Sequence, residues 1–166
     1  MSGDNLGTLT PPTAAAHAWL SSHLGHVVHC SDWLTISQER IVTFAQATGD
    51  HQWIHVDVER ARRESPYGST IAHGYLTLSL YPLLRGLIDG GKPMLPGMTN
   101  VINYGLNKTR FPAALLCGSR VRARCTLNSV EIIGPNSLQM IEQVAMEVEA
   151  QPKPACVAEA IMRIGF

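Results

Sequence analysis

Two side chains that can exchange protons, the carboxylate of Asp50 and the imidazole of His55, lie five residues apart in the run GDHQWIHVD. Such groups are the usual general acids and bases near neutral pH. The preceding residues predict a helix that ends near Thr48, and a second rigid element begins near Ile71. We expect the pair on a short loop between these elements, as an acid/base site requires. From the residues alone, a helix-end carboxylate beside a surface histidine remains the alternative.

Length and composition limit the classes of protein that the chain can be. The 166 residues fit one domain, and 13 basic side chains balance 13 acidic ones. No run of like charges occurs, so we expect no nucleic-acid partner and no membrane-surface helix. The four cysteines form no C-x-x-C pair, which favours buried thiols and a reducing cytoplasm. The N-terminus lacks a signal-peptide pattern, so we expect a disordered lead-in over residues 1–12 and a single domain over residues 13–166.

The first half of the chain shows mainly helical patterns. Residues 13–25 predict a helix that packs through Trp19, Leu20 and Leu24, and residues 26–30 predict a brief strand. Thr35 and Gln38 have capping-box spacing, which predicts the start of the helix that leads to Asp50. A charged helical turn is expected over residues 57–63, followed by a Pro/Gly/Ser loop over residues 65–69.

Residues 71–88 are apolar on every face of a helix, which predicts one long buried helix. Arg85, Pro82 and His73 interrupt this segment, so we do not interpret it as a membrane span.

The second half of the chain has the period of two that β-strands show. Apolar residues alternate with arginines from Arg120 onward, residues 138–148 repeat the alternation, and residues 155–164 show it less cleanly. Residues 98–110 predict a further strand, and turns are expected at residues 134–136 and 151–154. Strands that are segregated from one buried helix predict an α+β fold, with an antiparallel sheet wrapped around that helix.

Several separated motifs together resemble a known family. They are Thr48-Gly49-Asp50 with His55, then TIAHG with Leu78-Ser79-Leu80, and then YGLNK through Arg110-Phe111-Pro112. This combination resembles the MaoC-like dehydratases and (R)-specific enoyl-CoA hydratases, and more closely their nodulation-protein-N-like branch. The resemblance covers roughly residues 27–166 and implies a hot-dog fold. Gln52 and Trp53 stand where the hydratase motif has Asn and Pro, which puts the shape of the acyl pocket in doubt.

The resemblance implies hydration of a trans-2-enoyl thioester, or the reverse dehydration. Asp50 and His55 would act on one water and add it to one side of the double bond, and either could be the formal base. Gly74 would present its backbone N–H to the thioester oxygen, and Ser79 would hydrogen-bond the active-site carboxylate. A helix hydroxyl that bonds back to its own turn is the alternative for Ser79. A homodimer with joined sheets is implied as well, with coenzyme A or acyl carrier protein as the acyl carrier.

Other interpretations of these residues are retained beside this one. His73 reads as a structural histidine at a helix start, and no standard ligand spacing predicts a metal or other cofactor. Lys108 and Arg110 could meet the phosphates of coenzyme A, although a solvated strand edge explains them as well. The alternative functions are a hot-dog thioesterase and a non-catalytic binder of acyl thioesters.

Overall fold

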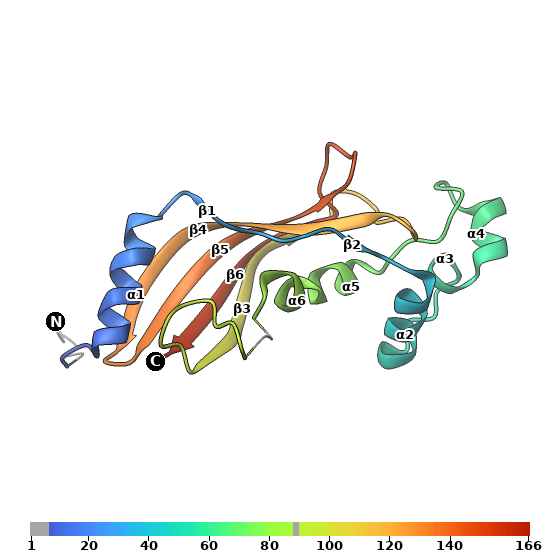
Figure 1. Ribbon diagram of the computed structural model, residues 1–166. Helices are drawn as coiled ribbons and strands as arrows, with labels where there is room; N and C mark the ends of the chain where they lie inside the picture. The colour runs from blue at the N-terminus through green and yellow to red at the C-terminus, as the bar shows by residue number, and fades with distance from the viewer. Residues whose placement is uncertain (1–6, 88–89) are drawn as a thin grey trace.

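The protein is described by a computed structural model that covers residues 7–87 and 90–166. One antiparallel sheet organises the chain, with the strand order β1-β4-β5-β6-β3 and with β2 also paired to β4. The strands are β1 (Val27–Cys30), β2 (Leu34–Thr35), β3 (Asn100–Arg110), β4 (Arg120–Gly134), β5 (Ser137–Val148) and β6 (Cys156–Gly165). The sheet curves around two short helices, as Figure 1 shows. The expected α+β fold with a wrapped antiparallel sheet is therefore confirmed.

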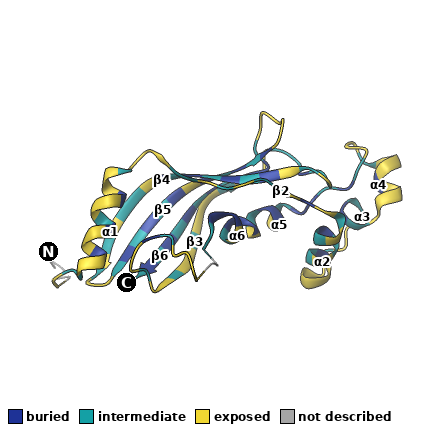
Figure 2. Ribbon diagram, in the orientation of Figure 1, coloured by how far each residue is buried: buried dark blue, intermediate teal, exposed yellow. Residues whose placement is uncertain are grey.

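The period-two patterns correctly predict which face of β4 and of β5 is buried. Alternate residues of β4, β5 and β6 are buried, while the arginines of β4 lie on the wetter face. Figure 2 shows buried residues along the central strands and in α5 and α6, and mostly exposed residues in α1, α2 and α4. The turns at residues 134–136 and 151–154 join β4 to β5 and β5 to β6, as predicted.

The helices lie in three places around the sheet. Helix α1 (Pro11–Ser22) packs on β4 and β5 at one end, and α5 (Gly74–Ser79) and α6 (Tyr81–Arg85) lie under the middle. The helices α2 (Gln38–Thr48), α3 (Trp53–Val56) and α4 (Val58–Glu64) project beyond the opposite end in Figure 1. The predicted site residues Asp50 and His55 belong to this projecting segment.

The N-terminal prediction needs correction in the residues that the structure describes. Helix α1 begins at Pro11, and the Thr10 N–H donates a hydrogen bond of 2.9 Å to the Pro135 carbonyl, so the ordered part starts before residue 13. The predicted disorder of residues 1–6 lies outside the described residues. Of the three predicted packing residues of α1, only Leu20 is buried, whereas Trp19 and Leu24 are exposed.

The N-cap residue of α2 is two positions later than predicted. Ser37 is the N-cap residue and its hydroxyl accepts a hydrogen bond from the Arg40 N–H, whereas Thr35 belongs to β2. Ser37 has the side chain that a cap needs. Arg40, however, stands three residues later, where a capping box has Glu or Gln, so the capping-box pattern does not identify Ser37.

The single long buried helix that residues 71–88 predict is not present. The described part of this segment forms two short helices, α5 and α6, and Pro82 stands at the start of the second. Proline has no N–H and clashes with the carbonyl of the preceding turn, so it favours a break there. The apolar faces are not all buried either, because Tyr75 is 71% exposed and Leu83 is 41% exposed.

A buried ion pair ties α6 to the sheet. Arg85 Nη2 donates to Glu142 Oε1 at 2.7 Å, and the Tyr81 hydroxyl donates to Glu142 Oε2 at 2.9 Å. Burial, with Glu142 nearby, raises the pKa of the Tyr81 phenol well above its usual value, so it stays a donor. No local sequence pattern predicts this pair, because its partners lie far apart in the chain.

The four cysteines do not all behave as predicted. Cys125 and Cys156 are buried, and burial raises the pKa of the Cys156 thiol to about 11, but Cys30 is exposed. Cys30 stands at the end of the edge strand β1, where neither face is fully covered. Among the described residues, no helix is both long enough and apolar enough to cross a membrane.

Candidate active site

Asp50 is delivered to the site by the end of α2. Gly49 caps this helix in the left-handed conformation, with φ 78°, and its N–H bonds the Ala45 carbonyl. Glycine adopts this conformation without the steric cost that other residues have. The chain turns there as predicted, and the Asp50 side chain remains 42% exposed. The carboxylate is therefore open to solvent and to a ligand.

His55 lies on the short helix α3 rather than on a loop, and it is buried. Its Nδ1 lies 2.7 Å from the Ile71 carbonyl. A carbonyl can only accept, so Nδ1 carries the hydrogen and a neutral His55 has its lone pair on Nε2. The Gln38 amide donates to the His55 carbonyl at 2.7 Å and accepts from the Thr70 hydroxyl, which holds α3 in place. The site thus contains an oriented imidazole with a basic nitrogen.

His73 joins the two predicted residues. Its Nε2–H donates to the Asp50 backbone carbonyl at 2.9 Å, and its ring stacks on that of His55 with the centroids 3.7 Å apart. Its Nδ1 is buried and has no partner among the described residues. His73 precedes α5 directly, which agrees with the predicted structural histidine at a helix start. Its place just before Gly74 in the IAHG motif was the one signal for a role in the site.

The polar atoms of the three side chains converge. One ligand atom each from Asp50, His55 and His73 lies within 4.8 Å of the others. Two polar atoms at such a separation can share one bridging water at ordinary hydrogen-bond lengths. Metal ligands can also lie at such distances, so the expectation of a metal-free site stays a prediction. The arrangement is suited to moving protons to and from one bound water.

Gly74 begins α5, three residues after the predicted helix start near Ile71. The N–H groups of a first helical turn have no partner within their own helix and can bind an oxygen atom of a ligand. A Cβ at Gly74 would lie 3.0 Å from Cγ of Phe111, whose ring is 41% exposed. The absence of a side chain therefore allows close packing against Phe111, and the binding of a thioester oxygen by the Gly74 N–H stays a prediction.

Ser79 lies at the other end of α5, and its hydroxyl donates to the Tyr75 carbonyl at 2.7 Å. This bond is the alternative that the sequence analysis retained, and Ser79 makes no bond to Asp50. Ser79 does line a cavity of about 340 Å³ between the helix pair and β3 and β6. Its neighbours there are mainly apolar: Leu78, Tyr81, Pro82, Asn103, Gly105, Leu106, Ala160 and Ile161.

The two basic residues near the end of β3, Lys108 and Arg110, have partners other than Asp50 and His55. The Lys108 ammonium pairs with Glu159 at 2.9 Å and its side chain is 79% exposed. Arg110 donates to the neighbouring Thr109 carbonyl. The solvated strand edge accounts for both, and contact with a phosphate stays a prediction.

Comparison with known proteins defines the class. The MaoC like domain family matches residues 20–150, so the chain belongs to this family. Its fold is the expected hot-dog fold. A MaoC-like dehydratase from Rhodospirillum rubrum is 19% identical, with a TM-score of 0.65 over 86% of this chain and 92% of that one. An (R)-hydratase from A. caviae involved in PHA biosynthesis is 20% identical, with a TM-score of 0.62 over 82% and 95% of the two chains. At such identities these two likenesses show the fold alone.

Two curated relatives are more similar in sequence. The 3-hydroxyacyl-thioester dehydratase Z of Mycobacterium tuberculosis is 51% identical over 144 residues, covering 87% of this chain and 92% of the relative. Nodulation protein N of Rhizobium leguminosarum bv. viciae is 43% identical over 145 residues, covering 87% and 88%. The resemblance drawn from the motifs is confirmed, and the chain is an enzyme of the dehydratase and hydratase class.

Proposed function

We propose that the protein catalyses the reversible (R)-specific hydration of trans-2-enoyl thioesters to 3-hydroxyacyl thioesters. The observation that supports this most directly is the convergence of Asp50 and His55 around a space that suits one water. The relative from Mycobacterium tuberculosis is a 3-hydroxyacyl-thioester dehydratase, and dehydration of a 3-hydroxyacyl thioester is the reverse of the proposed hydration.

In the proposed mechanism, the Asp50–His55 dyad holds the attacking water. His55 Nε2 accepts a proton as the water oxygen bonds to C3, and the π electrons move toward the thioester carbonyl to form an enolate. The dyad then returns the proton to C2 on the same face, which gives syn addition and restores both side chains. Atoms and electrons balance without a cofactor. His73 positions the pair through its bond to the Asp50 carbonyl and its stacking on His55.

Gly74 and the cavity beside Ser79 supply the rest of the proposed site. The Gly74 N–H faces the enolate oxygen, and removing one such donor typically costs about 2.7–4 kcal/mol of transition-state stabilisation. Five residue steps along α5, about 7.5 Å, separate Gly74 in its first turn from the cavity at Ser79. An acyl chain that follows α5 from the dyad reaches this apolar cavity, which favours a thioester with a hydrocarbon chain as the substrate.

We also infer a homodimer that joins two sheets through β3. This strand is long, lies at the edge of the sheet, and exposes Ile102 (56%), Tyr104 (54%) and Leu106 (48%). An exposed apolar edge strand favours pairing with another strand. Leu106 also lines the Ser79 cavity, so a partner at this edge would complete its wall.

Light scattering at micromolar protein tests the dimer. Ile102→Lys should give a monomer, whereas Ile133→Lys, at an exposed position on β4, should leave the dimer intact. A monomeric unmodified protein would contradict the inference.

A single assay with crotonyl-CoA separates the three candidate functions. Hydration removes the enoyl absorbance and yields 3-hydroxybutyryl-CoA, whose R configuration is checked by chiral chromatography. A thioesterase releases free coenzyme A thiol, measured against the background of the exposed Cys30 thiol. Binding without either product would leave a non-catalytic acyl-thioester binder. The same assay with crotonyl-acyl carrier protein compares the two carriers.

A further inference from the structure

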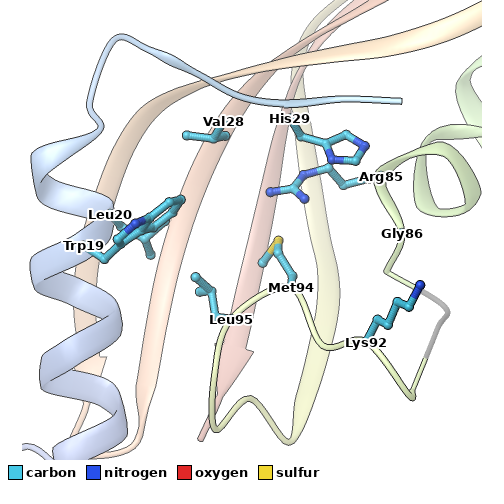
Figure 3. Close-up of a pocket in the computed structure, with 9 residues that line it drawn as sticks. All are labelled: Trp19, Leu20, Val28, His29, Arg85, Gly86, Lys92, Met94 and Leu95. Carbon is cyan, nitrogen blue, oxygen red and sulfur yellow. The ribbon is translucent and has the colours of Figure 1, made fainter. Parts of the chain in front are cut away.

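A second cavity, of about 330 Å³, lies far from the dyad at the α1 end of the molecule. Its walls come from α1, β1, the end of α6 and the loop before β3, as Figure 3 shows. The proposed reaction uses none of its lining residues: Trp19, Leu20, Val28, His29, Arg85, Gly86, Lys92, Met94 and Leu95. The cavity is therefore available for a different ligand.

The two sides of this cavity differ in chemistry. Trp19 and Leu20 form an apolar wall on α1, and Arg85, His29 and Lys92 lie on the other side in Figure 3. Among the described residues that line the cavity there is no aspartate or glutamate. A ligand that contacts both walls needs an apolar body and a group that accepts hydrogen bonds from cations.

The positive charge at this cavity is only partly neutralised. Arg85 is paired with the buried Glu142 through Nε and Nη2, so its charge is balanced there. His29 Nε2 donates to the Leu84 carbonyl at 2.8 Å. Lys92 is exposed, and its ammonium has no partner among residues 7–87 and 90–166. Lys92 therefore supplies the excess charge that would attract an anion.

An apolar extension continues from this cavity along α1. A neighbouring cavity of about 280 Å³ shares Trp19, Met94 and Leu95 with the first and adds Ala15, Ala16 and Pro96. We name the two cavities together the α1 groove. It has a cationic end at Lys92 and Arg85 and an apolar end at Ala15 and Pro96. That order matches the polarity of a molecule with an anionic head and a hydrocarbon tail.

We propose that the α1 groove binds an amphipathic carboxylate, such as a medium-chain fatty acid, at a site separate from the dyad. The carboxylate lies against Lys92 and the edge of the Arg85 guanidinium, and the alkyl chain runs past Trp19 toward Ala15. Charge-assisted hydrogen bonds orient the head, and burial of apolar surface holds the tail. The proposal does not rest on the hydration reaction, so each can fail without the other.

Calorimetric titration of the full chain with sodium decanoate tests the proposal. We expect saturable binding, with weaker binding of 1-decanol, which lacks the charge, and of butanoate, which lacks the tail. Lys92→Glu should weaken decanoate binding about ten- to hundredfold, the loss expected for a charged hydrogen bond. Lys92 is exposed, so this variant should keep the melting temperature and the crotonyl-CoA hydration rate of the unmodified protein.

Two further variants locate the bound ligand. Ala15→Trp fills the apolar end and should reduce decanoate affinity to that of butanoate. Ser79→Phe obstructs the cavity beside Ser79 and should leave decanoate binding unchanged. The proposal is overturned if decanoate does not bind at millimolar concentration, or if 1-decanol binds equally well. It is also overturned if Ser79→Phe abolishes binding while Lys92→Glu does not, because the ligand would then lie in the cavity beside Ser79.

Discussion

At the scale of single residues, one hydrogen bond decides which nitrogen of His55 can act as a base. The Ile71 carbonyl accepts a hydrogen bond from Nδ1–H, so Nε2 carries the lone pair in the neutral ring. The Asp50 carboxylate is held less firmly among the described residues. Its backbone hydrogen bond, from the Gln52 N–H to Asp50 Oδ1, is long, with 3.5 Å between the nitrogen and the oxygen. The imidazole is thus oriented by the fold, and the carboxylate keeps its freedom to meet a ligand.

The first prediction concerns shared action of the dyad. Asp50→Asn and His55→Ala should each lower kcat for crotonyl-CoA hydration about 10²–10⁴-fold, the usual loss for an acid/base group. The double variant should lose little more than the worse single one, because both groups act in one step. Steady-state kinetics on the three variants measure this. Fully multiplicative losses would contradict a shared water, and His51→Ala is the control at an exposed neighbouring position.

The second prediction separates two roles of Gly74. Gly74→Ala brings a methyl group against the exposed Phe111 ring, which can move, so the variant should fold. Gly74→Val should lose hydration activity more severely than thermal stability, because it blocks the thioester from the backbone N–H. Melting temperature and kcat are measured on the same samples. Combining Gly74→Val with Phe111→Ala relieves the packing, so activity that returns in this pair would indicate a packing role alone.

At the scale of elements, the outer face of the sheet is held by ion pairs between β4 and β5. Glu147 accepts hydrogen bonds of 2.7 Å from both Arg122 and Arg124. Burial alone would raise the pKa of Glu147, but the two guanidinium groups outweigh it and lower the pKa. The alternation that buries one face of β4 therefore also aligns its arginines with an acidic residue on the next strand.

The third prediction is a pH dependence of stability. A carboxyl group with a lowered pKa in the folded state stabilises it above the unfolded pKa, and this contribution is lost as the pH falls through the folded value. Glu147→Gln should cost about 0.5–1 kcal/mol near pH 7, and this difference should vanish as the pH falls below about 4. Urea unfolding at several pH values measures it. Glu131→Gln serves as the control, because Glu131 is on the same sheet but has no ion pair among the described residues. A cost of Glu147→Gln that does not change with pH would refute the stabilising role of the Glu147 carboxylate.

At the scale of the whole molecule, the buried Arg85–Glu142 pair joins the helix layer to the centre of the sheet. Glu142 is 0% exposed, and Arg85 is 8% exposed. Tyr81 lines the cavity beside Ser79, while Arg85 lines the α1 groove, so both cavities border this one cluster. The pair holds α6 where it separates the two cavities.

The fourth prediction follows from the cost of leaving one buried charge alone. Glu142→Leu should destabilise the protein by about 3–5 kcal/mol, because Arg85 would keep its charge without a partner. Replacing Glu142, Arg85 and Tyr81 together by Leu, Leu and Phe should recover most of that loss, since no buried polar group remains unpaired. Chemical denaturation measures both variants. A triple variant as unstable as Glu142→Leu would contradict this account.

The sequence alone determined the features that depend on local periodicity and on spacing along the chain. The buried faces of β4 and β5, the turns at residues 134–136 and 151–154 and the approach of Asp50 through Gly49 follow from neighbouring residues. Backbone geometry fixes where side chains point over such short distances. Only the tertiary structure decided contacts between distant segments. His73 reaches Asp50 across 23 positions, and Arg85 reaches Glu142 across 57. Such contacts depend on strand register and on how the helices pack, which no local pattern encodes.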